Sequence, residues 1–146
     1  MFVNSLETKT ENPSSDRVLL DTNILIHTIN NRPTKIRKRF SRHEHQLCIS
    51  TVSWGELVYG CEKSSRPEEN LADIESMANR LEIAVFDATA AAHSGQIRAE
   101  LARLGKSIGP YDMMIAGHAR SLGMVLVTNN VKEFRRVSGL RVENWT

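Results

Sequence analysis

The chain has 146 residues, of which 40% are hydrophobic and 25% are charged, and its formal net charge is +2. These values are typical of one compact globular domain, and the small net charge by itself identifies no class of partner. The sequence contains no run of 18 apolar residues that could span a membrane, and residues 1–17 lack the apolar stretch of a secretory signal. We therefore expect a cytoplasmic protein that makes no contact with a membrane.

Short apolar segments alternate with segments of helical periodicity along the chain. The expected strands are residues 17–21, 46–51, 82–86, 124–128 and 141–145. The expected helices are residues 22–31, 33–42, 53–64, 67–81, 88–105 and 110–123. This alternation predicts a single α/β domain with a parallel central sheet flanked by helices on both faces. Residues 1–16 are polar and are expected to form a flexible N-terminal tail, so the domain is assigned to residues 17–146.

A basic segment follows the first predicted helix. Six basic residues and no acidic residue lie between Arg32 and Arg42. Such a segment favours contact with RNA, DNA or an acidic protein, although a solvated helix face would show the same pattern. The two cysteines, Cys48 and Cys61, lie in apolar surroundings without a second pair, which predicts buried reduced thiols and neither a disulfide nor a zinc site.

Polar side chains stand at four junctions between predicted elements. Asp21 follows the first strand, Glu56 is placed in the first turn of the helix after the second strand, and Asp112 is placed in the first turn of the helix that Pro110 opens. Residues 128–130, Thr-Asn-Asn, follow the fourth strand. Because the carboxyl ends of parallel strands meet at one edge of a sheet, we expect these groups to lie together.

Each acid also has a purely structural explanation. Ser53 and Glu56 match a capping box, and Asp112 would interact favourably with the helix dipole. Asp21 has no such role, because Thr22 could cap the first helix. Three carboxylates at one edge repel one another unless a cation neutralises them, and hard oxygen ligands without histidine or cysteine suit Mg²⁺, with Mn²⁺ as a substitute.

Four segments of the chain resemble the PIN-domain ribonuclease toxins of the VapC family, which are the toxin halves of bacterial VapBC modules. The segments are LLDTNILI, ISTVSWGELVYG, IGPYDMMIAGHARSLG and LVTNNVKEFRRVSGLRVENW. They occur in the order and spacing of that family, and the resemblance extends from Val18 to Thr146. The amino acids of these segments resemble those of the enteric branch, whose members cut initiator tRNA in the anticodon loop.

The resemblance implies that the three acids bind a divalent ion and are the catalytic residues. It also implies that Asn23, Thr128 and Asn130 orient ligands or water around it. Many PIN domains carry a fourth acid where this chain has Asn130, so the number of bound ions stays open. A bound Mg²⁺ would activate water for attack on a phosphodiester.

The resemblance further implies partners. These are a VapB-type antitoxin, a tRNA substrate, a homodimer within a larger VapBC assembly, and operator DNA that is contacted only through the antitoxin. Of the basic segment, we expect Lys35, Lys38 and Arg42 to contact RNA phosphates. Two alternatives remain, an RNA-binding protein with a degenerate metal site and a metal-dependent DNA nuclease on the same fold. A receiver domain is disfavoured, because only Asp87 could stand near the end of a middle strand.

Overall fold

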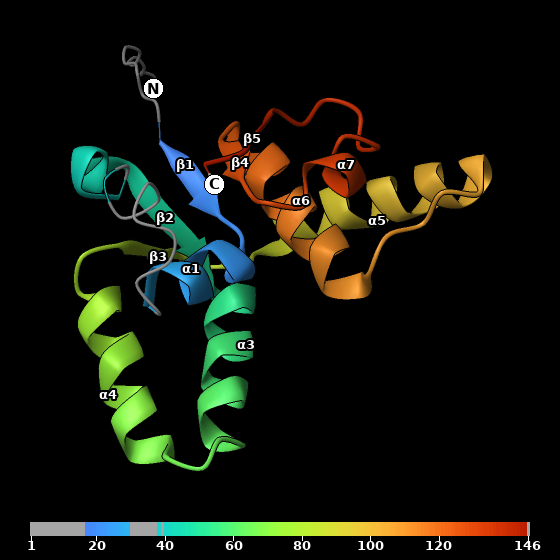
Figure 1. Ribbon diagram of the computed structural model, residues 1–146. Coiled ribbons are helices and arrows are strands. Elements are labelled where there is room, and N and C mark those ends of the chain that lie inside the picture. Colours follow the sequence, from blue (N-terminus) through green and yellow to red (C-terminus); the bar gives the residue numbers. More distant parts are fainter. Residues whose placement is uncertain (1–16, 30–37, 39, 146) are drawn as a thin grey trace.

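Five parallel strands form the central sheet of the computed structural model, which describes residues 17–29, 38 and 40–145 (Figure 1). The strands are β1 (Val18–Leu20), β2 (Leu47–Ser50), β3 (Glu82–Ala84), β4 (Val125–Val127) and β5 (Val142–Glu143). Their order in the sheet is β3-β2-β1-β4-β5, and every neighbouring pair is parallel. The predicted parallel α/β architecture is therefore confirmed.

Helices connect these strands. They are α1 (Thr22–Ile29), the short 3₁₀ helix η2 (Glu44–Gln46), α3 (Thr51–Glu62), α4 (Pro67–Ala78), α5 (Ala88–Leu104), α6 (Pro110–Leu122) and α7 (Val131–Phe134). The helix expected at residues 33–42 falls largely outside the described residues, as does the expected N-terminal tail. No helix in the described part of the chain is long and apolar enough to cross a membrane.

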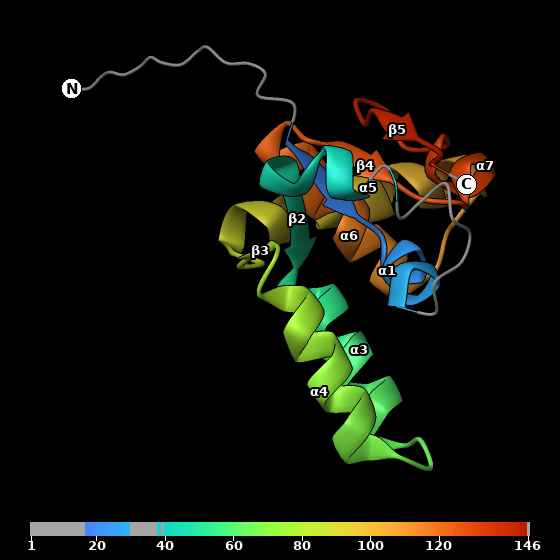
Figure 2. The ribbon, with the colours of Figure 1, turned by 60° about the vertical axis from the view of Figure 1, so that its left-hand side comes forward.

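The two faces of the sheet bury separate apolar clusters. Along β1, Val18 and Leu20 pack with α1, α3 and α4, whereas Leu19 packs with α5 and α6 on the opposite face. This division follows from the alternation of side chains along a strand. Figures 1 and 2 show α5 and α6 together on one side, while α3 and α4 lie side by side and extend away from the sheet. Both faces are thus covered, as the apolar strands require.

The ends of the two long helices agree with the sequence. Gly105 ends α5 and Gly123 ends α6, each with φ of +67° in the left-handed region that favours glycine. Between these helices, Gly117 of α6 lies directly against Ser94 of α5, where an added Cβ would stand 2.6 Å from the Ser94 backbone nitrogen. Glycine at position 117 therefore allows the two helices to pack closely.

The start of α3 differs from the prediction. Ser50, and not Ser53, is the N-cap, because its Oγ accepts a hydrogen bond from the Val52 backbone N–H at 3.0 Å. Glu56 consequently lies in the second turn of α3 and forms no capping box. The predicted structural role of Glu56 is therefore wrong, which leaves its side chain available for the site.

The cysteine prediction is confirmed, because Cys48 and Cys61 are buried free thiols. His118 is also buried, and its Nδ1 lies 2.9 Å from Ser50 Oγ. Burial lowers the pKa of His118, although Asp87 acts in the opposite direction. A neutral histidine bonded to the α3 cap has a structural role.

The strand order reverses between β1 and β4. From β1 the chain proceeds to β2 and β3 on one side, and it later returns to β4 and β5 on the other side. In open α/β sheets, ligands bind in the crevice outside the carboxyl ends of the strands at such a reversal. Asp21 directly follows β1 and Thr128 directly follows β4, so both stand at this crevice.

Candidate metal centre

Asp21 is held in a fixed position at the crevice. Its backbone N–H donates to the Val127 carbonyl at 2.9 Å, and its own carbonyl accepts from the N–H groups of Ile24 and Leu25 in the first turn of α1. The carboxylate is only 3% exposed, and its Oδ2 accepts a hydrogen bond of 2.8 Å from the fully buried hydroxyl of Thr128. The sheet, the helix and the side-chain partner thus all orient this acid.

Glu56 reaches the same crevice from α3. Its Oε1 accepts a hydrogen bond of 2.8 Å from the hydroxyl of Thr22, the residue after Asp21. The same hydroxyl lies 3.0 Å from Oγ of the buried Ser53. Thr22 therefore connects the start of α1 to α3 instead of capping its own helix, and it keeps the Glu56 carboxylate beside Asp21.

Two further acids complete the cluster. Asp112 lies in the first turn of α6 after Pro110, as the sequence predicted. Glu133 lies on α7, a four-residue helix that the sequence analysis did not anticipate, and it forms a side-chain hydrogen bond with Asp112. Glu133 Oε1 is buried and has no hydrogen-bond partner among the described residues. An unsatisfied buried carboxylate oxygen is costly, and it marks a place for a cation or a donor from a ligand.

Glu133 was missed because the prediction concentrated on Asn130 as the position of the family's fourth acid. Asn130 instead occupies the N-cap position of α7, and its backbone N–H donates to Thr128 Oγ1 at 2.9 Å. The pattern Asn-x-x-Glu over residues 130–133 is a helix-start signal that would have predicted this turn. The fourth carboxylate is thus supplied one turn after Asn130.

The four acids affect one another electrostatically. Burial raises the pKa of Asp21, the Thr128 hydrogen bond lowers it, and the charges of Glu56 and Glu133 raise it again. For Asp112, burial, the hydrogen bond that its protonated form donates to Glu133 and the charges of the other three acids raise the pKa to about 7. A carboxyl group that retains a proton near neutral pH shows that the cluster holds more negative charge than it can neutralise alone.

The donor set is suited to a hard divalent cation. All four groups are carboxylates, which Mg²⁺ and Mn²⁺ prefer, and soft or imidazole ligands are absent from these four. As they stand, no three His, Cys, Asp or Glu side chains within the described residues are close enough to hold one ion. The four carboxyl groups fit a cation in their chemistry and in their shared crevice, although no three of them converge on one point. The orphaned oxygen of Glu133 is consistent with a cation at this crevice.

An open cleft of about 960 Å³ adjoins the acids. Asp21 and Asp112 line it together with Glu56 and the exposed Asn23. The cleft walls also include residues that had been given no role. Gly55, Tyr59, Gly60, Tyr111 and Met114 lie within the quoted family-like segments, and Lys63 lies outside them. A polymer can therefore reach the carboxylates from solvent.

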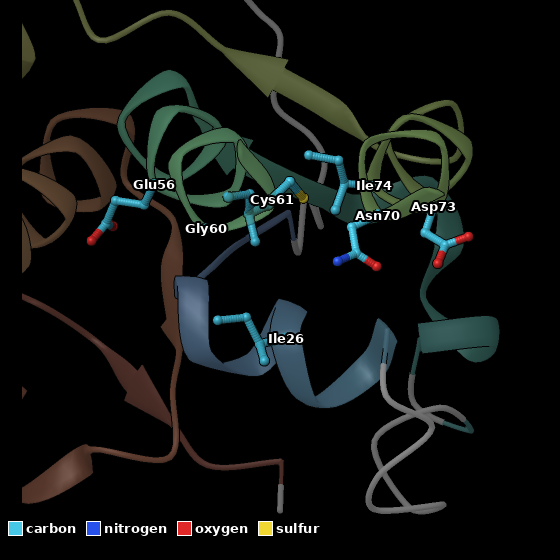
Figure 3. A pocket seen from close by; sticks show the side chains of 8 residues that line it. Ile26, Glu56, Gly60, Cys61, Asn70, Asp73 and Ile74 are labelled. Atoms are coloured by element: carbon cyan, nitrogen blue, oxygen red, sulfur yellow. The ribbon is translucent and has the colours of Figure 1, made fainter. Parts of the chain in front are cut away.

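A second, smaller groove of about 270 Å³ lies between α1, α3 and α4 (Figure 3). Ile26 of α1 faces Gly60 and Cys61 of α3, and Ile74 of α4 lies on the opposite wall. The groove is mostly apolar, and it shares Ile26, Gly60 and Glu56 with the acidic cleft. The two hollows therefore adjoin along α3.

Neither described member of the predicted RNA-binding set lines the acidic cleft. Lys35 lies outside the described residues, while Lys38 and Arg42 are exposed. Arg42 precedes His43 and the helix η2, which leads into β2, and it lines a separate hollow with His43, His45 and Gln46. Their contact with RNA stays a prediction, whereas Lys63 is a cation that does line the cleft.

The sequence of this chain is similar to a known family and to individual named proteins. Residues 18–140 match the PIN domain family. The chain is 55% identical over 130 residues to the tRNA(fMet)-specific endonuclease VapC of Shigella flexneri, a match that covers 89% of this chain and 98% of the relative. It is 49% identical over 129 residues to ribonuclease VapC2 of Haemophilus influenzae strain KW20, covering 88% of this chain and 98% of that one.

Solved structures show the same fold. The DNA-bound VapBC complex of Salmonella typhimurium contains a chain that superimposes with a TM-score of 0.86 at 54% identity, covering 89% of this chain and 98% of that chain. VapBC2 of Rickettsia felis, bound to a DNA fragment from its promoter, gives a TM-score of 0.84 at 36% identity, with 88% of this chain and 98% of that chain covered. The likeness spans nearly the whole length of each relative.

Proposed function

This chain belongs to the PIN-domain family and to its VapC ribonuclease toxins, and from this premise we propose that it cleaves tRNA as a metal-dependent endoribonuclease. One observation carries the proposal: four carboxyl groups from β1, α3, α6 and α7 gather where the strand order reverses, beside an open cleft. The names of the relatives from Shigella flexneri and Salmonella typhimurium support tRNA(fMet) as the substrate.

In the proposed mechanism, Asp21, Glu56, Asp112 and Glu133 hold Mg²⁺, for which Mn²⁺ substitutes. When bound, such a cation supplies an activated water and neutralises charge that develops on the phosphate. The chain's own residues prepare the site: Thr128 fixes the Asp21 carboxylate and Thr22 fixes that of Glu56. Because Asp112 holds a proton near neutral pH, that proton must leave before the carboxylate can act as a ligand.

Asn23 and Asn130 are proposed to orient ligands around the acids. Asn23 is exposed and lines the cleft, so its amide can reach a water or a phosphate oxygen. The Asn130 backbone acts through Thr128, whose hydroxyl also contacts Asp21. The cleft is open to solvent, which suits an anticodon loop whose unpaired bases are splayed out. Cleavage there would stop translation.

The proposed cellular partner is a VapB-type antitoxin. Structures of relatives contain VapBC complexes, two of them with DNA, which supports operator contact through the antitoxin. A basic antitoxin side chain paired with the four carboxylates would block cation binding. We place the pair in the cytoplasm, where tRNA is found. A homodimer is also proposed, and its candidate surfaces are the parts of residues 54–64 and 90–105 that do not line the acidic cleft. Sedimentation that detects only monomer at micromolar concentration would contradict it.

The deciding experiment incubates the purified protein with total tRNA and with branched DNA. We expect cleavage of tRNA that requires Mg²⁺ or Mn²⁺, stops with EDTA, and is abolished by Asp21→Asn and by Glu133→Gln. The matched control is Asp73→Asn, because Asp73 is an exposed acid on α4 that does not line the acidic cleft. Cleavage of branched DNA alone would favour the DNA nuclease, and binding without cleavage would favour a degenerate site.

A further inference from the structure

Two tyrosines stand beside the carboxylates with most of their surface in solvent. Tyr111 immediately precedes Asp112 at the start of α6 and is 56% exposed. Tyr59 lies one turn after Glu56 on α3 and is 65% exposed. Both line the acidic cleft, and they come from two different helices. Large aromatic side chains are usually buried, so their exposure at a catalytic cleft requires an explanation.

The surface of α3 near Tyr59 includes two glycines, which have no side chains to cover the helix backbone. Gly55 and Gly60 lie inside the helix, although glycine there is less favourable than alanine. A Cβ added at either position would meet no heavy atom of the described residues within 4 Å, so packing among those residues does not require glycine at these sites. Both glycines line the same cleft as Tyr59. A molecule from outside the described chain that closely approaches the helix backbone would account for them.

A positive charge accompanies one of the tyrosines. Lys63 Nζ lies 5.0 Å from the centroid of the Tyr59 ring, in a cation–π contact, and Lys63 also lines the cleft. Near this helix the cleft therefore offers an aromatic surface and an ammonium group side by side. Nucleotides have the matching features, because every base has a flat π-face and every linkage carries a negative phosphate.

We propose that Tyr59 and Tyr111 are stacking platforms for two unpaired bases next to the scissile phosphate of a single-stranded RNA segment, and that Lys63 contacts a neighbouring phosphate. This inference rests on the proposed ribonuclease function and names the groups that position its substrate. It predicts that the substrate is unpaired at the cut, since a base within a duplex cannot stack on a protein ring. The bare surface at Gly55 and Gly60 leaves room for the backbone that joins the bases.

A second copy of this chain is the competing occupant of the same surface. A second copy would bring the same three cleft-lining acids against one lysine, so docking the two clefts together would bury an excess of carboxylates over cations, which is unfavourable. Single-stranded RNA supplies phosphates for the lysine and bases for the rings, while leaving the scissile phosphate at the acids. The chemistry of the cleft therefore favours RNA.

The test measures RNA affinity in an inactive Asp21→Asn background, with a fluorescently labelled, unstructured RNA of ten nucleotides. Tyr59→Ala and Tyr111→Ala should each weaken binding about tenfold, within the roughly 5- to 150-fold range of base–aromatic stacking. Tyr59→Trp and Tyr111→Trp should retain affinity. Val85→Ala is the control, because Val85 is 71% exposed and does not line the cleft.

Modified RNA separates stacking from a structural effect. Replacing the two central bases with abasic sites keeps every phosphate, so the tyrosine variants should then bind as well as their parent does. A 2-aminopurine at either position should be quenched on binding by the parent and less by the matching alanine variant. Unchanged affinity of both alanine variants for intact RNA would overturn the proposal.

Three further outcomes would show which proposal has failed. If the alanine variants dissociate a dimer in sedimentation while RNA affinity per protomer is unchanged, the tyrosines belong to a protein interface and the stacking role is wrong. If the unmodified chain cleaves tRNA but neither tyrosine affects RNA affinity, only this inference fails. If the unmodified chain neither binds nor cleaves RNA, the proposed function fails with it.

Discussion

Asp112→Asn should stabilise the metal-free protein at alkaline pH while removing its activity. In the folded chain the pKa of Asp112 is raised from 3.8 to about 7 by burial, by the hydrogen bond that it donates to Glu133 and by the charges of Asp21, Glu133 and Glu56. At a pH between these two pKa values, Asp112 has lost its proton in the unfolded chain and keeps it in the folded chain. The free energy of unfolding therefore falls as pH rises from about 4 to about 7, and this loss is complete above pH 7.

The size of this effect follows from the same numbers. Each pH unit between the two pKa values corresponds to about 1.4 kcal/mol, which gives an upper limit of about 4 kcal/mol. Asp112 is only half-buried, so solvent screening reduces the expected destabilisation to about 1 to 2 kcal/mol. For a domain of this length that corresponds to a rise in Tm of roughly 3 to 8 °C when asparagine removes the charge.

Thermal unfolding in EDTA from pH 4.5 to 8.5 measures this prediction. The Tm of the Asp112→Asn variant should exceed that of the parent above pH 7, and the gap should close toward pH 4.5. Asp73→Asn serves as the control, because Asp73 is exposed on α4 and its substitution should leave the two curves parallel. At pH 8, Mg²⁺ should stabilise the parent much more than the Asp112 variant. A constant Tm difference across the whole pH range would refute the electrostatic explanation.

Two other substitutions probe how the fold supports the site. Thr128→Val removes the buried hydrogen bond to Asp21, so unfolding free energy should fall by about 1 to 3 kcal/mol and tRNA cleavage should decrease, whereas Thr128→Ser should retain both, as urea titration and cleavage rates will show. Gly117→Ala should cost about 1 to 3 kcal/mol, because its Cβ would stand 2.2 Å from Ser94 Oγ and 2.6 Å from the Ser94 nitrogen. Gly95→Ala, where an added Cβ meets nothing within 4 Å, should stabilise the same helix pair in the same titration.

The sequence alone was sufficient to locate the strands and to place Asp21 and Asp112 relative to their elements. Short apolar runs followed by polar residues mark the carboxyl ends of β1 and β4, and the position of Asp21 follows directly from the first of them. Pro110 and Gly123 bound α6, so Asp112 was placed in its first turn correctly. These features depend on neighbours along the chain, which a sequence displays.

Features that depend on contacts between residues far apart in the chain could not be predicted from local sequence patterns. Two serines, Ser50 and Ser53, were each compatible with the start of α3. The choice depends on the pairing of Ser50 with Ala84 of β3, because that pairing extends β2 to Ser50 and begins the helix at the next residue. Likewise, the link from Thr22 to Glu56 joins residues 34 positions apart. Local capping patterns contain no information about either contact.

Glu133 shows how a local signal becomes meaningful only through the fold. A helix of four residues has little stability of its own, so α7 depends on the burial of Phe134 against the sheet. That anchoring turns Glu133 toward Asp112 and gives the cluster a fourth carboxylate, although Asn130 is neutral. Four ionised groups would repel strongly, and the proton kept by Asp112 relieves part of that repulsion. Because a cation must displace this proton, cation affinity should rise as pH passes through about 7, and the chemistry of the site is thereby coupled to the same charge balance that limits its stability.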